Sequence, residues 1–331
     1  MQGVILEGVN QKFIVNEVPV PRLNAGEVLV KIKAAALNHR DYWITKGQYA
    51  GLKFPIILGS DGSGLVDSVF DDEHKNLIGK QVIINPGSNW GDNENFQSKD
   101  FKILGLPENG TFAEYVKVNA SSIFPKPQHL TFEEAAAFPL AGLTAHRALF
   151  TKAHATKRDN ILITGIGGGT ATFALLWATS LGANVYVTSS SDQKINAAIK
   201  MGAKGGVNYN NKNWDNDLKE ISGGIDIIID SAIGDGFSKH LTYINFGGRI
   251  VFFGATAGDL PALNARTIFW KQIQILGTTM GTDKDFADML QFINTHKIVP
   301  IIDQVFGFED ANSAIERMAS ANQFGKIILK P

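Results

Sequence analysis

The segment Ile161-Leu162-Ile163-Thr164-Gly165-Ile166-Gly167-Gly168-Gly169-Thr170-Ala171 carries the strongest structural signal in this chain of 331 residues. Its first four residues predict a short buried strand, and a mostly apolar helix is predicted over Thr170–Leu181, with Gly182 as its C-terminal stop. Glycines between a strand and a helix permit a tight turn and let backbone N–H groups approach a pyrophosphate at the helix N-terminus. The segment therefore predicts a dinucleotide-binding turn with these cofactor-binding residues: Gly165, Gly167, Gly168, Gly169 and Thr170.

Buried strands and helices alternate downstream of this turn. A helix is predicted over Asp192–Met201, and further strands are predicted at Val185–Thr188, Gly206–Asn208, Ile225–Asp230, Arg249–Phe253 and Ile273–Gly277. With Ile161–Thr164 these make six strands, and such a repeated strand–helix pattern favours a doubly wound parallel sheet. A glycine turn that binds nothing is the alternative, but its place at the start of this alternation favours a Rossmann domain.

The end of the second strand indicates which nicotinamide cofactor is bound. NAD-binding enzymes usually place Asp or Glu about 20 residues beyond the glycine turn, where it binds the ribose hydroxyls. Here Ser189, Ser190 and Ser191 stand at that place, followed by Asp192 and Lys194. Serine hydroxyls and a lysine ammonium bind a 2′-phosphate, whereas a carboxylate repels it. Ser189, Ser190 and Lys194 therefore predict NADPH rather than NADH, and Asp192 is interpreted as a cap of the next helix.

The first third of the chain predicts strands and turns. Val28–Ala34 is expected to be a strand, Ile56–Val69 a bent or bulged strand, and Asn85–Asn109 a long loop. Thr131, with Glu134 three residues later, has the spacing of a capping box and begins a helix. A helix and a strand are expected near the C-terminus, at Lys284–Thr295 and Lys326–Leu329.

Composition and charge exclude several kinds of function. The chain has no cysteine, which excludes disulfides, thiol nucleophiles and cysteine-ligated zinc. The formal net charge is −1, so the chain gives no electrostatic support for binding nucleic acid or an anionic membrane. The uncharged stretch Ile161–Ser191 is long enough to span a membrane, but its glycines favour a buried strand, turn, helix and strand instead. The segment Met1–Phe13 does not resemble a secretory signal, so we expect a cytoplasmic protein.

Several short motifs, taken in their order along the chain, resemble the medium-chain dehydrogenase/reductase superfamily. They are Ala35–Asp41, Gly47–Tyr49, Pro55–Gly64, Gly110–Tyr115, Leu140–Ala145, the glycine turn and Gly247–Val251. The resemblance implies an α/β protein with a GroES-like β-rich catalytic domain (residues 1–125 and 284–331) and a Rossmann dinucleotide-binding domain (residues 126–283). It also implies a homodimer, and the strand Ile273–Gly277 at the edge of the sheet is expected to pair with its counterpart.

Within that superfamily the chain resembles the zinc-free branch that includes the quinone oxidoreductases. Zinc-type alcohol dehydrogenases bind their catalytic metal through a Cys, a His and then a Cys or Asp. Matched motif by motif, Asn38, Ser60 and Leu140 stand at these three positions. An amide, a hydroxyl and an alkyl side chain do not make a zinc site, so we expect no bound metal.

Without a metal, the resemblance implies hydride transfer from NADPH to a quinone or an α,β-unsaturated carbonyl. The negative charge then moves to an oxygen, which a hydrogen-bond donor stabilises. Related enoyl thioester reductases use a tyrosine of the same turn as proton donor, so Tyr49 is the expected general acid, with water as the alternative. Asn38 is expected to orient the nicotinamide ribose or the acceptor oxygen, and Tyr42 and Trp43 to line the acceptor pocket.

The family pattern implies further cofactor contacts. These are Thr144, Tyr209, Phe253, Gly254, Ala255, Met280 and, near the C-terminus, Lys326. His146 and His240 are interpreted as structural residues, because no catalytic partner is evident for either.

Three alternatives to the NADPH-dependent reductase remain open. An enoyl thioester reductase would need basic residues that hold the phosphates of coenzyme A. A zinc-free alcohol or carbonyl dehydrogenase would need a general base, and the sequence shows no candidate. A non-catalytic NADPH-binding sensor or structural protein would bind the cofactor without turnover on any small-molecule acceptor.

Overall fold

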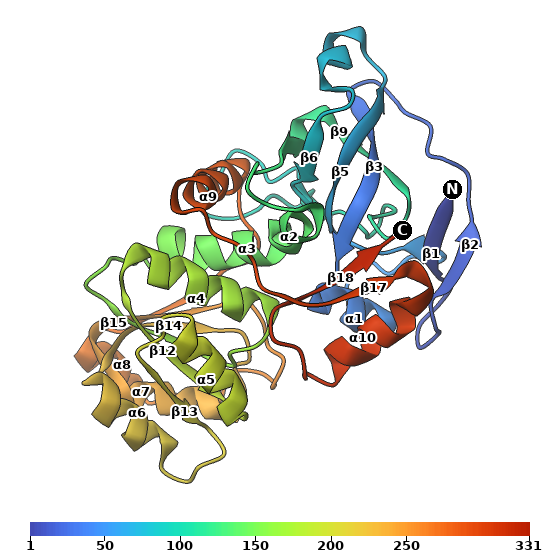
Figure 1. Ribbon diagram of the computed structural model, residues 1–331. Coiled ribbons are helices and arrows are strands. Elements are labelled where there is room, and N and C mark those ends of the chain that lie inside the picture. Colours follow the sequence, from blue (N-terminus) through green and yellow to red (C-terminus); the bar gives the residue numbers. More distant parts are fainter. The chain divides into compact units, whose positions relative to one another are not determined.

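The computed structural model describes residues 1–331, which form two compact units (Figure 1). Unit 1 contains Met1–Ala141 and Gly281–Pro331, and unit 2 contains Gly142–Met280. The sequence predicts domain boundaries after residues 125 and 283. The first boundary lies further along the chain because helix α2 (Phe132–Ala137) packs on strands β3 (Glu27–Ala36) and β5 (Asp61–Val69) of unit 1.

Unit 2 is built on one six-stranded sheet in which every neighbouring pair of strands is parallel. Its strand order is β13-β12-β11-β14-β15-β16, so the prediction of a doubly wound parallel sheet is confirmed. The strands are β11 (Asn160–Ile163), β12 (Asn184–Ser189), β13 (Gly205–Asn208), β14 (Ile225–Asp230), β15 (Ile244–Phe252) and β16 (Gln274–Gly277). The helices are α3 (Pro139–His146), which crosses the boundary, α4 (Gly169–Leu181), α5 (Asp192–Lys200), α6 (Trp214–Ser222), α7 (His240–Tyr243) and α8 (Ala265–Lys271).

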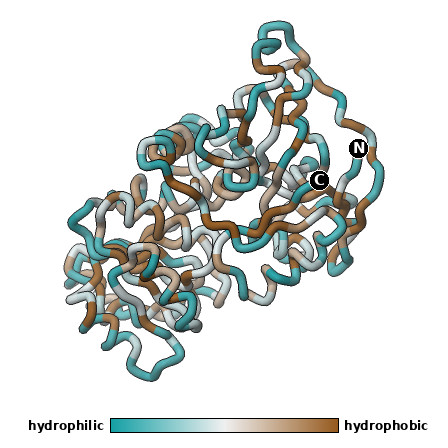
Figure 2. The backbone as a smooth tube through the Cα atoms, in the orientation of Figure 1, coloured by the Kyte–Doolittle hydropathy of each residue, from teal (hydrophilic) through white to brown (hydrophobic).

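Apolar burial explains why these segments form strands and helices. Leu162 and Ile228, on the two central strands, are fully buried, and burial of such a side chain contributes about 1.5–3 kcal/mol. On α4, Phe173 stacks on Trp177 with ring centroids 5.5 Å apart. The helix ends at Gly182, whose φ of 85° is the left-handed conformation of a helix C-cap. By contrast, the loop of residues 209–213 after β13 is hydrophilic (Figure 2).

Unit 1 contains a seven-stranded sheet with the order β10-β6-β5-β3-β18-β17, to which β9 is added by pairing with β3. A three-stranded sheet (β2-β1-β4) and a short pair (β7-β8) complete its strands. The remaining strands are β1 (Gln2–Leu6), β2 (Ile14–Glu17), β4 (Ile56–Ile57), β6 (Gln81–Ile84), β7 (Gly87–Ser88), β8 (Lys102–Ile103), β9 (Tyr115–Asn119), β10 (Ile123–Pro125), β17 (Ile302–Gly307) and β18 (Lys326–Lys330). The remaining helices are α1 (His39–Thr45), α9 (Asp283–His296) and α10 (Ala311–Ala319).

Two segments of unit 1 differ in detail from the expectation. The bent strand expected over Ile56–Val69 is two strands, β4 and β5, in different sheets. Gly59, with a φ of 94°, lies in the break between them, where a side chain would collide with Phe112. The long loop expected over Asn85–Asn109 contains the short β7–β8 pair, and Thr131 and Glu134 form the expected capping box of α2.

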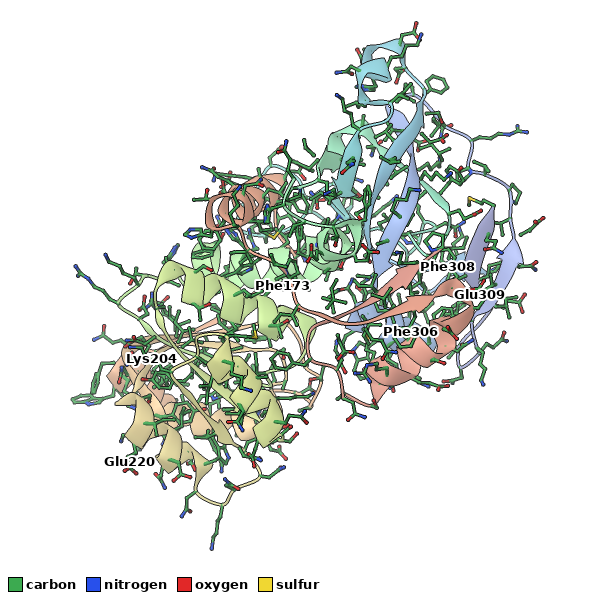
Figure 3. The ribbon with its side chains drawn as sticks, in the orientation of Figure 1. Phe173, Lys204, Glu220, Phe306, Phe308 and Glu309 are labelled. Atoms are coloured by element: carbon green, nitrogen blue, oxygen red, sulfur yellow. The ribbon has the colours of Figure 1, made fainter.

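The C-terminal segment completes the sheet of unit 1. Strand β18 pairs in parallel with β17 and antiparallel with β3, so residues near the C-terminus lie beside residues near the N-terminus (Figure 1). Phe308, just after β17, is fully buried in the core of this unit (Figure 3). None of the helices has the length and apolar character that crossing a membrane requires.

Candidate functional site

A buried ion pair connects the C-terminal strand to the motif that contains Asn38. Lys326 on β18 and Asp61 on β5 are 3 and 0% exposed, and their Nζ and Oδ2 atoms are 3.1 Å apart. Lys326 also donates to Asn38 Oδ1 (2.6 Å), and Asn38 Nδ2 donates to Asp61 Oδ2 (2.9 Å). Burial raises the pKa of Asp61 above its usual value, although the charge of Lys326 and the hydrogen bond from Asn38 both act to lower it. The Asn38 amide is thus held by protein groups on both its oxygen and its nitrogen.

Asn38 is the N-cap of helix α1, and the Asp41 side chain completes a capping box with it. The backbone N–H of Asn38 donates to Asp41 Oδ2 (2.8 Å), while Asp41 Oδ1 is buried without a hydrogen-bond partner. Burial raises the pKa of Asp41 to about 6, against the opposing attraction of Arg40. Asp41 therefore has a structural role at the start of α1.

Arg40 forms a second buried group on the same helix. It is 7% exposed, and its Nη1 donates to Ser60 Oγ (2.6 Å) and to the Leu104 carbonyl oxygen (2.8 Å). Its Nε donates to Tyr49 Oη at 3.4 Å, and the guanidinium carbon lies 5.1 Å from the centre of the Tyr49 ring. The sequence reasoning missed Arg40, because its partners Ser60 and Leu104 are 20 and 64 residues away along the chain.

The aromatic residues predicted for the acceptor pocket lie on or just after α1. Tyr42 and Trp43 are half-buried and meet edge to face, with ring centroids 5.0 Å apart. Tyr42 and Tyr49 both pack against the core of unit 1. Unit 1 therefore places Asn38, Tyr42, Trp43 and Tyr49 on or beside one short helix.

The glycine turn of unit 2 has the geometry of a phosphate-binding turn. Gly165 and Gly167 have φ values of 62 and 130°, which favour glycine. Gly168 is the N-cap of α4, and no side chain caps this helix. A Cβ atom added at Gly165 or Gly168 would meet nothing within 4 Å. The helix N-terminus is therefore open to an anionic group, and these residues fit a dinucleotide pyrophosphate.

The serines predicted to select the cofactor follow β12. Ser189 is buried and Ser190 is exposed, whereas Ser191 Oγ accepts from the Lys194 N–H (3.4 Å). The residue that caps this helix is therefore Ser191, and not Asp192 as the sequence suggests. Asp192 Oδ1 instead accepts a hydrogen bond from Asn208 Nδ2 (2.9 Å). The carboxylate thus has a structural partner on the neighbouring strand.

The other predicted cofactor residues follow the carboxyl ends of further strands. Tyr209 comes after β13 and is exposed, and Met280, beyond β16, is 2% exposed. Phe253, Gly254 and Ala255 come directly after β15. Because the strands are parallel, these ends meet at one edge of the sheet, where ligands of this fold bind. Two predicted residues lie elsewhere: Thr144, buried on α3, and Lys326, on β18 of unit 1.

A buried network that the sequence reasoning missed joins the ends of β11 and β14. Asp230 accepts from Thr164 Oγ1 (2.9 Å) and the Ala232 N–H (2.8 Å), and its Oδ2 is 2.9 Å from His240 Nε2. His240 Nδ1 lies 2.5 Å from Tyr243 Oη. Burial alone would raise the pKa of Asp230, but the bond to His240 holds it below its usual value. Thr164 directly precedes the glycine turn, so this network fixes the position of the residue at which the turn starts.

Comparison with known proteins agrees with this architecture. Two family models match the chain: an alcohol dehydrogenase GroES-like domain over residues 24–128, and a zinc-binding dehydrogenase over residues 169–295. A zinc-type alcohol dehydrogenase-like protein of Leptosphaeria maculans is 37% identical over 335 residues, covering 95% of this chain and 93% of that protein. An acryloyl-coenzyme A reductase of Sulfurisphaera tokodaii is 28% identical over 344 residues, covering 100% of both.

Solved structures show the same relationship. The crystal structure of an NAD-dependent alcohol dehydrogenase superposes with a TM-score of 0.92 at 34% identity, covering 100% of both chains. The chain belongs to the zinc-type alcohol dehydrogenase-like members of the medium-chain dehydrogenase/reductase superfamily, a superfamily of oxidoreductases. The resemblance found in the sequence is thus confirmed, as are the GroES-like and Rossmann folds.

The zinc ion that the family description implies does not fit the residues present. Asn38 is bonded to Asp61 and Lys326, and Ser60 Oγ is 2.6 Å from the positive guanidinium of Arg40. Leu140 offers an alkyl side chain. No cluster of three or more His, Cys, Asp or Glu side chains able to hold a metal is found. The buried guanidinium of Arg40, which has no carboxylate partner, would repel a divalent ion beside Ser60.

Proposed function

We propose that this protein is a zinc-independent, NADPH-dependent reductase that transfers hydride to a quinone or an α,β-unsaturated carbonyl. One observation carries the proposal: the positions of the zinc ligands hold Asn38 and Ser60, bonded to the buried cations Lys326 and Arg40. Oxidation of an alcohol relies on a Lewis acid, which these residues do not provide. Reduction of a conjugated carbonyl needs only a donor for one developing oxyanion.

Unit 2 supplies the cofactor site of this proposal. The N–H groups at the start of α4, with Gly165–Gly169, would hold the pyrophosphate, and the bound nicotinamide would supply the hydride. Ser189, Ser190 and Lys194 would bind the 2′-phosphate. The engagement of Asp192 with Asn208 supports NADPH, because this carboxylate is committed to the protein. The remaining predicted contacts, from Thr144 to Met280, stay part of this proposal.

Unit 1 supplies the acceptor site. Tyr49 would donate the proton, since its oxygen already accepts from Arg40 Nε and its own hydrogen is left to donate. Tyr42 and Trp43 would bound the acceptor. Asn38 would position cofactor or acceptor through the hydrogen of Nδ2 that Asp61 does not use, while Lys326 would act by fixing the Asn38 amide.

An enoyl thioester reductase is the second candidate. The match over the full length of an acryloyl-coenzyme A reductase favours it, since that substrate is also a conjugated carbonyl. Reduction of an enoyl thioester also develops negative charge on one carbonyl oxygen and needs one proton donor. The two candidates therefore differ only in the acceptor.

We also propose that the protein is a homodimer. Strand β16 lies at the edge of the sheet of unit 2, where its outer hydrogen-bonding groups are unpaired within the chain. Three large apolar side chains of the same unit are strongly exposed: Phe246 (69%), Phe269 (66%) and Trp270 (71%). Such exposure is typical of a surface that another chain covers.

The experiment is a titration of purified, chelator-treated protein with NADPH and NADH, followed by assays of NADPH oxidation with a quinone, a small enone and an enoyl thioester. The proposal predicts tighter binding of NADPH and turnover with the quinone or the enone without added metal. Turnover with the thioester alone would select the second candidate. Turnover that appears only after zinc is restored would overturn zinc independence, and absence of nucleotide binding would overturn the whole proposal.

A further inference from the structure

The guanidinium of Arg40 is a buried charge without a carboxylate partner. The side chain is 7% exposed and bonds only neutral oxygens, those of Ser60, Leu104 and Tyr49. Asp41 attracts it from a distance but forms no ion pair with it. Buried charges in proteins are normally paired, because removing a charge from water is costly. The protein therefore retains a positive charge here that nothing in the chain directly neutralises.

The hydrogen bonds of Arg40 leave one nitrogen unused. A guanidinium has five N–H donors, of which two lie on Nη1, two on Nη2 and one on Nε. Nη1 donates to Ser60 and Leu104, and Nε donates to Tyr49. Nη2 forms no hydrogen bond within the protein, and it is not one of the fully enclosed polar atoms. Nη2 is therefore the guanidinium nitrogen at which a ligand can be placed, beside the Tyr49 hydroxyl.

We propose that Arg40 Nη2 binds the carbonyl oxygen of the acceptor and holds the negative charge that develops there, the role that a metal ion has in zinc-type relatives. Ser60, to which Nη1 is bonded, stands at the position of a zinc-binding histidine. The choice of acceptor rests on the proposed reductase function, whereas the oxyanion site rests on unit 1 alone.

The unused donors also define the class of acceptor. A carboxylate pairs best with parallel donors on two guanidinium nitrogens. With Nη1 and Nε committed to the protein, only Nη2 remains, and it suits a single oxygen. The site therefore favours a neutral enone or quinone, whose reduction places charge on one oxygen, over an acceptor held by its carboxylate.

The chemistry of an enone balances at this site. Its β carbon gains a hydride, the two π electrons move to the carbonyl oxygen at Arg40, and the reduced nicotinamide is oxidised. A proton then reaches the α carbon, and the C=O bond is restored. Tyr49, which lies beside Arg40, is placed to supply that proton.

The test measures an oxyanion probe on the protein without cofactor. 4-Nitrophenolate absorbs visible light only when ionised, and 4-nitroanisole is its neutral analogue. We expect wild-type protein to bind the phenolate about tenfold more tightly than the anisole, as for a charge-assisted hydrogen bond. Benzoate should bind more weakly than the phenolate. Arg40→Met should remove the preference for the phenolate, and Arg22→Met, which changes an exposed arginine of the same unit, should keep it.

Equal binding of phenolate and anisole by wild-type protein would overturn the inference, and so would benzoate bound as tightly as phenolate. Both comparisons need no variant, so they hold even if Arg40→Met fails to fold. Because the titration contains no nucleotide, it separates this inference from the proposed function. Phenolate binding without NADPH binding would keep the oxyanion site and overturn the reductase.

Discussion

Lys326 and Asp61 form an ion pair, 3.1 Å long and almost completely buried, between residues separated by 265 positions in the chain. Replacing Lys326 with alanine leaves the Asp61 carboxylate buried without its cation. We expect Lys326→Ala to lower the free energy of unfolding by about 3–5 kcal/mol, as for other broken buried pairs. Denaturant unfolding of the purified variant measures the loss.

Lys330→Ala is the matched control for this pair. Lys330 lies on the same strand and pairs with Glu133, but its side chain is 43% exposed. Exposed pairs contribute about 0–1 kcal/mol, so this variant should unfold nearly as the wild type does. Equal losses for the two lysines would show that strand β18, and not the buried charge, determines the effect.

Asp41 should make stability depend on pH between about 4 and 6. Its pKa rises from 3.8 in the unfolded chain to about 6 in the folded protein, so the folded state binds the proton more tightly. Its contribution to stability is fully present below pH 4 and is lost as pH rises through 6, a difference of about 3 kcal/mol. Asp41→Asn removes this titration. The stability of the variant relative to wild type should therefore increase from pH 5 to pH 8, and an unchanged difference would contradict it.

Gly168→Ala tests the glycine turn without disturbing the fold. The φ of Gly168 is −70°, which alanine adopts readily, and a Cβ there meets nothing within 4 Å. The added methyl group would occupy the space in which we place the pyrophosphate. We expect an unchanged melting temperature and a loss of NADPH affinity of about tenfold or more. Gly236→Ala, at an equally open position of unit 2, is the control and should bind NADPH normally.

Ser190→Asp tests the predicted choice of cofactor. Ser190 is exposed at the end of β12, so the substitution should not affect folding. A carboxylate there would repel the 2′-phosphate and accept hydrogen bonds from the ribose of NADH. The dissociation constant for NADPH should rise about tenfold while that for NADH stays or falls. Ser238→Asp adds the same charge at an exposed site, and an equal effect there would remove Ser190 from the phosphate site.

Asp230→Ala should destabilise unit 2. Asp230 accepts hydrogen bonds from Thr164 Oγ1 and from the backbone N–H groups of Ala232 and Ile233, and it contacts His240. The substitution leaves these buried groups without their acceptor. Each such loss costs about 1–3 kcal/mol, so we expect a total of about 3 kcal/mol or more in urea unfolding. Asp235→Ala, an exposed change five positions on, should cost under about 0.5 kcal/mol. A similar midpoint for both variants would show that the network contributes little.

The Rossmann unit was predictable because its signals are local. Each strand is a short apolar run, and the glycine turn and Gly182 mark the ends of α4, so the predicted bounds differ from the observed ones by a residue or two. The exception is β15, which begins at Ile244 and not at Arg249. Asn245 and the glycines at 247 and 248 interrupt its apolar pattern, and pairing with β14 overrides that weak local signal.

The polar networks were not predictable, because they depend on contacts between distant segments. The sequence indicates no partner for His240, and only the fold brings Asp230 and Tyr243 to its two ring nitrogens. Lys326 was expected at the cofactor, and nothing near it in sequence indicates its ion pair with Asp61. Arg40 lies inside the recognised Ala35–Asp41 motif, where a basic residue two positions after Asn38 was the available signal.

The position of β18 also bears on how this chain is made. Unit 2 is one uninterrupted segment of the chain, so it can fold during translation. The sheet of unit 1 instead needs β18 between β3 and β17, and β18 follows the whole of unit 2 in the chain. The first 141 residues therefore cannot complete their sheet until residues 326–330 have been synthesised. Loss of this one strand would take away both an inner strand of the sheet and the cation of Asp61.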